Sequence, residues 1–284
     1  MKKMLILSLI FCLLAAVVFA SESDGIFSYR VGQFEVYMLV GAEREGNATI
    51  IPGANDAVLK RFIPASGFMH ATNAFLIKAP GRNILVDTAF GGPIFEKLEK
   101  LGVKPEQIDA VLLSHLHGDH IGGLQANGRP IFPNAKIYLD SKERDHFTGI
   151  AVNQGAVDAL RAYGSSVITF DALPIGPVYK EILPGISAIA NYGHTPGHTV
   201  FLVESRGEKL IIAGDFLHVA LVQFSLPEIS ATFDMDQRAA ASSRTQIMDY
   251  AARRRIPVGA MHIVYPGIGI VEADGFGFKF VPLK

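Results

Sequence analysis

The sequence predicts an α/β fold in which sheets are covered by helices. Apolar strands and amphipathic helices interleave in both halves of the chain, which favours helix-covered sheets over an all-β sandwich. Hydrophobic residues make up 49% of the 284 residues, enough to bury a large core. No low-complexity linker or abrupt change of composition divides residues 21–284, so we expect one domain over that range.

The chain begins with a segment typical of a secretory signal peptide. Two lysines precede an uncharged apolar run, Met4 to Phe19, and the small residue Ala20 follows it. The run is short for a bilayer span and polar residues come directly after it, which favours cleavage over an uncleaved membrane anchor. We therefore expect residues 1–20 to be a signal peptide and the mature protein to be periplasmic or secreted, without a stable membrane anchor.

The composition of the mature chain excludes several classes of site and partner. The single cysteine, Cys12, lies in the signal segment behind Phe11, where a lipoprotein signal needs a small residue. A chain without thiols must bind metal through nitrogen and oxygen ligands. Cleavage removes two of 26 basic residues, leaving 24 against 27 acidic ones and a net charge of −3. No basic run exceeds residues 253–255, which are typical of an exposed helix end, so a nucleic-acid partner is not expected.

The expected elements follow from apolar periodicity and from turn residues. Strands are predicted at Phe34–Val40, Ile108–Ser114, Ala135–Asp140, Ile186–Tyr192, Pro257–Ile263 and Phe276–Val281. Helices are predicted at Pro93–Gly102, Lys142–Phe147, Val157–Gly164 and Asp236–Arg255. In the last of these, Asp236 can cap the start, and one face is apolar: Ala240, Ile247, Met248 and Ala251.

Two hairpins suggest an internal repeat. Residues 73–86 (NAFLIKAPGRNILV) and 199–212 (TVFLVESRGEKLII) each contain an apolar strand, a polar turn with glycine and a second apolar strand. Phe75 matches Phe201 at the same offset. Any two hairpins share this outline, so the repeat alone does not establish that the fold is duplicated.

The stretch SHLHGDHIGGL, from Ser114 to Leu124, contains a dense group of potential metal ligands. In an extended segment, side chains at i and i+2 point the same way, so His115 and His117 can bind one ion. Gly118 would allow a sharp turn, after which Asp119 and His120 point elsewhere. Because a zinc-type ion takes about four ligands, two ions would need more ligands than this turn provides.

Three further residues fit the missing positions. His194 follows a predicted strand in the stretch GHTPGHT, Asp215 follows the apolar stretch LIIAG, and His262 follows PVGAM. Each is a polar residue placed just after an apolar strand and near glycine or proline. One such residue is usually an ordinary loop side chain, but their joint occurrence with the HxHxDH cluster favours metal binding.

HLHGDH, followed in order by His194, Asp215 and His262, resembles the metallo-β-lactamase superfamily, whose fold is an αββα four-layer sandwich with a two-metal site at one edge. The resemblance implies that His115, His117 and His194 bind one ion, that Asp119, His120 and His262 bind the other, and that Asp215 bridges both. It further implies that Asp87 orients a metal-binding histidine, with a turn cap as the alternative role.

The second half of the chain resembles a particular branch. GHTPGHTVFLVESRGEKL, VALVQFSLPEIS and HIVYPGIGIVEADGFGFKFVPL are similar to methyl parathion hydrolases and their lactonase relatives. True β-lactamases generally lack an aspartate bridging the ions, and flavodiiron oxygen reductases usually have glutamate where this chain has His117.

The resemblance implies two divalent ions, with zinc expected first and manganese, cobalt or iron as alternatives. Such ions could share a water and lower its pKa towards about 7, giving a hydroxide nucleophile. We expect Asp119 and His218 to be the catalytic side chains. At the position of His218 the homoserine lactonases carry tyrosine and the parathion hydrolases leucine. A donor there favours lactones, whereas the alternative is a partly exposed loop histidine.

The expected function is hydrolysis of small lactones or activated esters, with phosphotriesterase activity as a further expectation. Alternatives are an organophosphate hydrolase and, less favoured, a β-lactamase or an iron-dependent persulfide dioxygenase. Relatives of this kind are often dimers, so a homodimer is an open expectation. His198 is expected to support the GHTPGHT turn, His146 to lie on a polar helix and His70 to lie in a loop away from the ligands. Three aromatic residues near strand ends could line an apolar substrate pocket, but such residues are more often core, so they are left out of the predicted site: Phe68, Phe90 and Tyr265.

Overall fold

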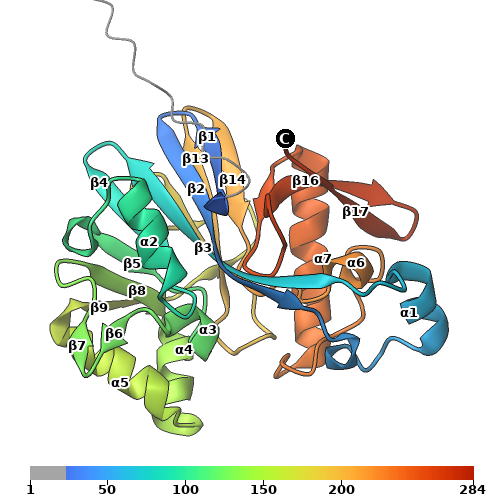
Figure 1. Ribbon diagram of the computed structural model, residues 1–284, viewed down its shortest axis with the longest axis horizontal. Helices are drawn as coiled ribbons and strands as arrows, with labels where there is room; N and C mark the ends of the chain where they lie inside the picture. Colours follow the sequence, from blue (N-terminus) through green and yellow to red (C-terminus); the bar gives the residue numbers. More distant parts are fainter. Residues whose placement is uncertain (1–23) are drawn as a thin grey trace, which may run out of the picture.

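The computed structural model describes residues 24–284, so the predicted signal peptide, residues 1–20, lies outside the described residues. Two sheets stack face to face between outer helices (Figure 1). The seven-stranded sheet has the order β1 (Ile26–Val31), β2 (Phe34–Glu45), β3 (Met69–Ala79), β4 (Arg82–Val86), β5 (Ala110–Leu112), β8 (Lys136–Asp140) and β9 (Val167–Phe170). The α/β class predicted from the interleaved pattern is confirmed.

The second sheet has eight strands. Its order is β10 (Leu173–Pro174), β12 (Ile186–Ala190), β13 (Thr199–Ser205), β14 (Glu208–Ile212), β15 (Val258–Gly259), β16 (Ile268–Asp274) and β17 (Gly277–Pro282), with β11 (Lys180–Leu183) also paired to β12. A small separate ribbon consists of β6 (Gln125–Ala126) and β7 (Arg129–Pro130).

The helices lie on the outer faces of the sheets and at the site. They are α1 (Asp56–Phe62), α2 (Pro93–Lys100), α3 (Gly118–Ile121), α4 (Ser141–Asp145), α5 (Gln154–Tyr163), α6 (Ala220–Gln223) and α7 (Gln237–Arg254). A π-helical turn, η4 (His146–Ile150), follows α4, and short 3₁₀ turns are η2 (Ala48–Ile50), η3 (Pro105–Gln107) and η5 (Gly164–Ser166). Within residues 24–284, none of these helices combines the length and the apolar character that crossing a bilayer requires.

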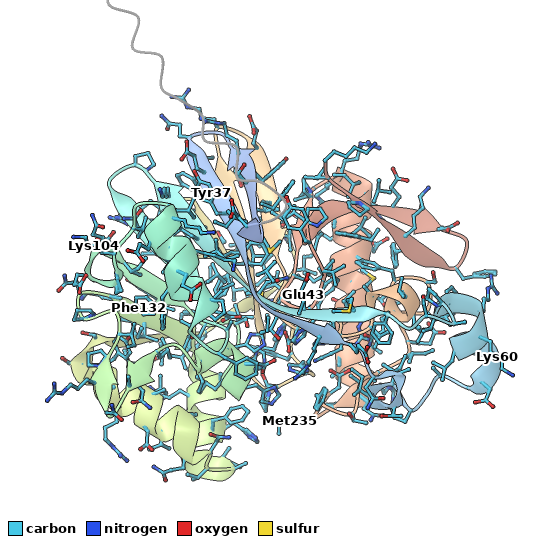
Figure 2. The ribbon with its side chains drawn as sticks, in the orientation of Figure 1. Tyr37, Glu43, Lys60, Lys104, Phe132 and Met235 are labelled. Atoms are coloured by element: carbon cyan, nitrogen blue, oxygen red, sulfur yellow. The ribbon has the colours of Figure 1, made fainter. Side chains whose placement is uncertain are left out.

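Three apolar cores explain the four layers. The core between the sheets contains Phe75 from β3 and Phe201 from β13. A second core joins the first sheet to α2 and α5 and contains Phe132, and a third joins the second sheet to Met248 of α7. Figure 2 shows Phe132 inside the half of the molecule formed by the first sheet and its helices. Lys60 projects outwards from α1. Each sheet therefore buries one face on the other sheet and one on helices.

The predicted repeat is present as two equivalent hairpins. In β3–β4, Phe75 pairs with Val86, and in β13–β14, Phe201 pairs with Ile212. Each hairpin is followed by a parallel neighbour, β4 by β5 and β14 by β15. The two halves therefore bring the carboxyl ends of corresponding strands to the same edge of the sandwich.

Several predicted elements have different bounds in the structure. The strand predicted at Pro257–Ile263 is only the two-residue β15, while β1, β16, α1 and α6 were not predicted. Gly118 is not a sharp turn: it is the first residue of α3 and has no left-handed backbone. The direction of the chain changes because a helix starts there. Asp236 does cap α7, accepting a hydrogen bond from the Ala239 amide at 2.9 Å.

Candidate metal centre

Loops at one edge of the sandwich carry the predicted ligands. Two follow β5 and two lie on α3, and one each follows β12, β14 and β15. All seven come together in overlapping groups of potential metal-binding atoms: His115, His117, Asp119, His120, His194, Asp215 and His262. The short parallel pairings of β5 and β15 end here, so the chain is free to direct these side chains across the sheet edge.

The first group consists of three histidines. His194 Nε2 lies 3.2 Å from His115 Nε2 and 3.1 Å from His117 Nδ1. Ligands placed tetrahedrally at ~2.1 Å from one ion would be about 3.4 Å apart. The spacing of these three nitrogen atoms therefore suits a single small divalent ion.

The second group contains Asp119, His120 and His262. The Asp119 carboxylate lies 3.7 Å from Nε2 of each of the two histidines. Asp215 lies between the groups, with Oδ1 3.1 Å from His120 Nε2 and Oδ2 3.4 Å from His194 Nε2. Oδ2 also lies 3.0 Å from His262 Nε2, so the Asp215 carboxylate contacts both groups, as a bridging ligand requires.

Hydrogen bonds on the outer side of the rings determine which nitrogen atoms face the centre. His120 Nδ1 lies 2.7 Å from the Asp87 carboxylate, and His262 Nδ1 lies 2.7 Å from the Ala71 carbonyl. Both partners are acceptors, so in the neutral rings that bind metal each Nδ1 would carry the proton and each Nε2 would present a lone pair inwards. The contact predicted between Asp87 and a histidine of the cluster is confirmed.

His194 is oriented by a carboxylate that the sequence analysis missed. Its Nδ1 lies 3.0 Å from Asp234 Oδ1, and the other oxygen of Asp234 accepts a 3.0 Å hydrogen bond from Arg244. Arg244 is completely buried in α7. It stands between Ala240 and Met248 at four-residue spacing on the apolar face. A cation in that position needs a buried acidic partner, and this signal could have pointed to Asp234.

Two buried atoms are left without partners at the centre. Among residues 24–284, His120 Nε2 and Asp215 Oδ1 have no hydrogen-bond partner, although they lie 3.1 Å apart. Burial opposes protonation of His120, but the carboxylates of Asp215 and Asp87 outweigh it and raise the pKa of His120 well above its usual value. Burial likewise opposes ionisation of Asp215, but His120 and His262 hold its pKa well below the usual range. The centre therefore favours positive charge, which fits divalent ions.

His218 and His70 lie on either side of His262. The His218 ring stacks on that of His262 at 4.9 Å, and the His70 ring lies 4.4 Å from it. His218 is only 3% exposed, so it is not a partly exposed loop residue. The expectation that His70 lies in a loop away from the ligands is wrong: it is a buried residue of β3. The long-range pairing that extends β3 could not be seen in the local sequence.

Two buried groups hold the ligand loops in place. His198 bonds to the Asn191 carbonyl at 3.1 Å and accepts the Asp215 amide at 2.9 Å, so it supports the GHTPGHT turn as predicted. Glu143 of α4 accepts hydrogen bonds from the amides of Leu116 and Gly197, both at 2.9 Å. One carboxylate therefore joins the loop that carries His115 and His117 to the loop that carries His194.

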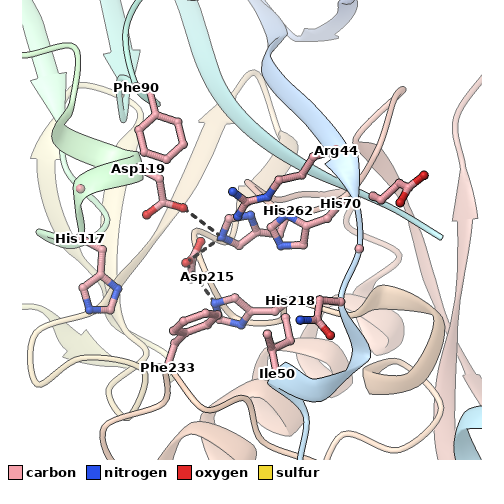
Figure 3. Close-up of a pocket in the computed structure, with 14 residues that line it drawn as sticks. Arg44, Ile50, His70, Phe90, His117, Asp119, Asp215, His218, Phe233 and His262 are labelled. Atoms are coloured by element: carbon pink, nitrogen blue, oxygen red, sulfur yellow. Dashed lines mark hydrogen bonds and ion pairs between the residues drawn. The ribbon is translucent and has the colours of Figure 1, made fainter. Parts of the chain in front are cut away.

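A cavity of about 540 Å³ opens onto these residues (Figure 3). Asp119, Asp215 and His218 line its floor, and the exposed rings of Phe90 and Phe233 line its sides. Phe90 therefore belongs to the cavity and not to the core. Phe68 and Tyr265 are not among the residues that line this cavity within the described chain.

Comparison with known proteins agrees with this geometry. The family model described as "Metallo-beta-lactamase superfamily" matches residues 68–259. The structure of AidC, titled a dizinc quorum-quenching lactonase in complex with a product, N-hexnoyl-L-homoserine, has a TM-score of 0.82 and 26% identity, covering 92% of this chain and 98% of that one. The hydrolase AbOPH, at 24% identity and a TM-score of 0.81 over 92% of this chain and 98% of that one, shows the same fold.

A hydroxyacylglutathione hydrolase of Xanthomonas oryzae pv. oryzae is 34% identical over 201 residues, which cover 64% of this chain and 74% of the relative. The matches to three other curated relatives span 66%, 64% and 40% of those proteins, less than two thirds of each. Since the family model covers most of the described residues and includes six of the seven clustered side chains, the chain belongs to the metallo-beta-lactamase superfamily.

Proposed function

We propose that this protein is a dinuclear-metal hydrolase that opens lactones or activated esters. The observation that carries the proposal is the position of Asp215 between two groups of metal-binding side chains, with its carboxylate in contact with both. When bound, two divalent ions would lower the pKa of a shared water and polarise the carbonyl of the substrate. Zinc suits the nitrogen and oxygen donors, and manganese, cobalt or iron are the alternatives.

The donor geometry fits the ligand assignment that the family resemblance implies; His218 and Asp234 also lie in overlapping groups of metal-binding atoms, and we assign them other roles. His115, His117 and His194 would hold the first ion, and Asp119, His120 and His262 the second, with Asp215 shared. The spacing within each group and the inward-facing lone pairs support this assignment. The outer partners, Asp87 and Asp234, would keep His120 and His194 in the tautomer that binds metal.

His218 is proposed to contact the reacting ester group. Its ring lies on the cavity floor, with Nε2 3.3 Å from Asp215 Oδ2. Its Nδ1 is buried and has no partner within residues 24–284. An imidazole N–H here can donate one hydrogen bond to the carbonyl or to the departing ring oxygen. A lactone opens without losing a fragment: the acyl C–O bond breaks, the ring oxygen leaves as an alkoxide of the same molecule and takes up one proton. A single donor beside that oxygen can hydrogen-bond to it as its charge develops.

The relatives support hydrolysis of a small molecule and favour a lactone. AidC, which matches 92% of this chain, is described as a dizinc quorum-quenching lactonase. The cavity volume of about 540 Å³ is in the range of small-ligand sites, and Phe90 and Phe233 offer apolar contacts for an acyl group.

The test is a substrate panel with the metal-loaded protein and His218→Leu. The panel contains an aryl lactone, an acyl homoserine lactone, an aryl phosphotriester and a cephalosporin. We expect lactone turnover, and a loss of about tenfold or more in kcat/KM for the lactones in His218→Leu. Phosphotriester turnover should hold or rise. The metal content of His218→Leu should stay at that of the wild type, which would separate hydrogen bonding from metal binding.

Other outcomes would exclude the proposal. Cleavage of the phosphotriester or the cephalosporin alone would make the lactone assignment wrong. An iron centre that consumes oxygen, detected by its spectrum, would indicate a redox enzyme, because zinc is spectroscopically silent.

A further inference from the structure

Arg44 is a cation at the cavity that the proposed reaction does not use. It is the only arginine or lysine among the described residues that line the cavity. Within residues 24–284 it has no ion pair or side-chain hydrogen bond. Figure 3 shows its side chain extending from β2 towards His262 and the metal-binding cluster. A guanidinium that faces a cavity without an acidic partner is available to bind an anionic ligand.

The strand pairing explains why Arg44 points into the cavity. Arg44 is the cross-strand partner of His70, so the two side chains project from the same face of the ribbon formed by β2 and β3. His70 lines the cavity and packs on His262. Arg44 therefore lies one strand away from a ring that touches the metal-binding cluster.

A β-bulge is responsible for this register. The pairing of β2 with β3 shifts between Val40 and Ala42, which leaves Gly41 without a partner. Because side chains alternate along a strand, the extra residue reverses the faces of all later residues, and without it Arg44 would point away from this cavity. A Cβ atom at Gly41 would lie 2.7 Å from Ala89 Cβ, so the bulge needs glycine at this close approach.

Glu45 does not neutralise Arg44. Neighbouring residues of a strand point to opposite faces, and Glu45 also lines a separate surface hollow with Ser66, Phe68 and Met69. Glu45 thus lies at the rim shared by the two hollows. The acidic residues on the cavity floor, Asp119 and Asp215, belong to the proposed metal site.

We propose that Arg44 binds a carboxylate on the substrate, at the end of the molecule away from the bond that is cleaved. A guanidinium matches a planar carboxylate in a bidentate pair. The inference rests on the proposed function and makes it more specific: the substrate is an acidic lactone or ester, not a neutral one. The metal site would hold the ester carbonyl while Arg44 holds the far end.

The substrates for the test differ only in charge at the far end. N-succinyl homoserine lactone ends in a carboxylate, and its succinamoyl analogue ends in a carboxamide of nearly the same size. The corresponding lactams cannot be opened by ordinary lactone hydrolysis and report binding alone. A phosphonate analogue separates carboxylate recognition from general anion binding. Ring opening is followed by acid release, and lactam binding by calorimetry, with the metal-loaded protein.

We expect the carboxylate to be preferred about tenfold or more over the carboxamide, in kcat/KM for the lactones and in Kd for the lactams. Arg44→Gln should bring this ratio close to one. Arg82→Gln, at the exposed start of β4, is the matched control and should keep the preference of the wild type.

Equal binding of the two lactams, or a preference that survives in Arg44→Gln, would overturn the inference. So would a phosphonate that binds about tenfold more tightly than the carboxylate. If the lactams show the expected preference and neither lactone is opened, the role of Arg44 stands and the proposed lactonase function fails. If both lactones are opened equally well, the lactonase function stands and the role of Arg44 fails.

Discussion

Single hydrogen bonds on the outer side of the cluster set the orientation and tautomer of its histidine rings. Asp87 has a left-handed backbone, with φ at 54°, and accepts the Ser114 amide at 2.8 Å as well as the His120 ring at 2.7 Å. It also accepts the Ser114 hydroxyl at 2.6 Å, and that hydroxyl lies 3.1 Å from His115 Nδ1. One carboxylate therefore orients a histidine of each proposed ion site.

Asp87→Asn should weaken metal binding while the protein remains folded. The amide cannot accept both the ring proton of His120 and the Ser114 hydroxyl with the same strength, so the histidines would lose their preferred tautomers. We expect the affinity for the metal ions to fall about 10- to 100-fold, measured by competition with a chelator. Asp158→Asn, on the exposed side of α5, is the control. Unchanged affinity in Asp87→Asn would refute the orienting role.

At the scale of elements, the position of α7 against the ligand loops depends on a glycine. Gly193 precedes His194 and has a φ of 131°, which L-residues with side chains rarely adopt. A Cβ atom there would lie 2.1 Å from the Ala240 amide nitrogen, in the first turn of α7. The amide of Asp236, the cap of α7, also donates to the Gly193 carbonyl at 2.8 Å. The loop that carries His194 therefore packs directly on the first turn of α7.

Gly193→Ala should destabilise the protein by about 3 kcal/mol or more, because backbone strain and a clash with α7 add together. Gly81→Ala is the matched control: Gly81 also has a positive φ, but no heavy atom lies within 4 Å of its Cβ position. That variant should lose only about 1–2 kcal/mol. Urea unfolding measures both. If Gly193→Ala fails to fold and Gly81→Ala folds, the prediction is also supported. Equal losses in the free energy of unfolding would contradict the packing argument.

At the scale of the whole molecule, folding buries several histidines in the uncharged form. Burial lowers the pKa of His70 and His194 to about 3 and that of His198 to about 4. In the unfolded chain these residues titrate near the usual value of about 6.5. At pH values between the folded and unfolded pKa values, the unfolded chain binds protons that the folded protein does not.

The free energy of unfolding of the metal-free protein should therefore fall as the pH decreases from about 6.5 to 4. Each of these histidines contributes up to about 1.4 kcal/mol per pH unit in that range. Glu143, whose pKa burial raises to about 7, acts in the opposite direction, but burial lowers the pKa of His115 and His117 as well. His120 and His262, whose pKa values are raised, oppose this trend near pH 6.5 and add little slope at lower pH, where both states are protonated. Urea unfolding at several pH values measures this change. A free energy of unfolding that stays constant or rises as the pH falls would refute the prediction.

Sequence patterns predicted best those features whose residues lie close together in the chain. The HxHxDH cluster, His194, Asp215 and His262 could be predicted because each is a polar side chain just after an apolar strand. The hairpins at residues 73–86 and 199–212 could be predicted because their pattern is complete within a few residues. Asp87 was found through the resemblance to the family.

The sequence by itself determined the fold class, the family and the set of side chains that meet at the sheet edge. Only the tertiary structure decided the surroundings of that set. Asp234 depends on a buried arginine of α7, His70 on the extension of β3, and Arg44 on a bulge that reverses the face of β2. Strand register and helix packing are properties of residues far apart in the chain, so no local pattern specifies which way these three side chains point.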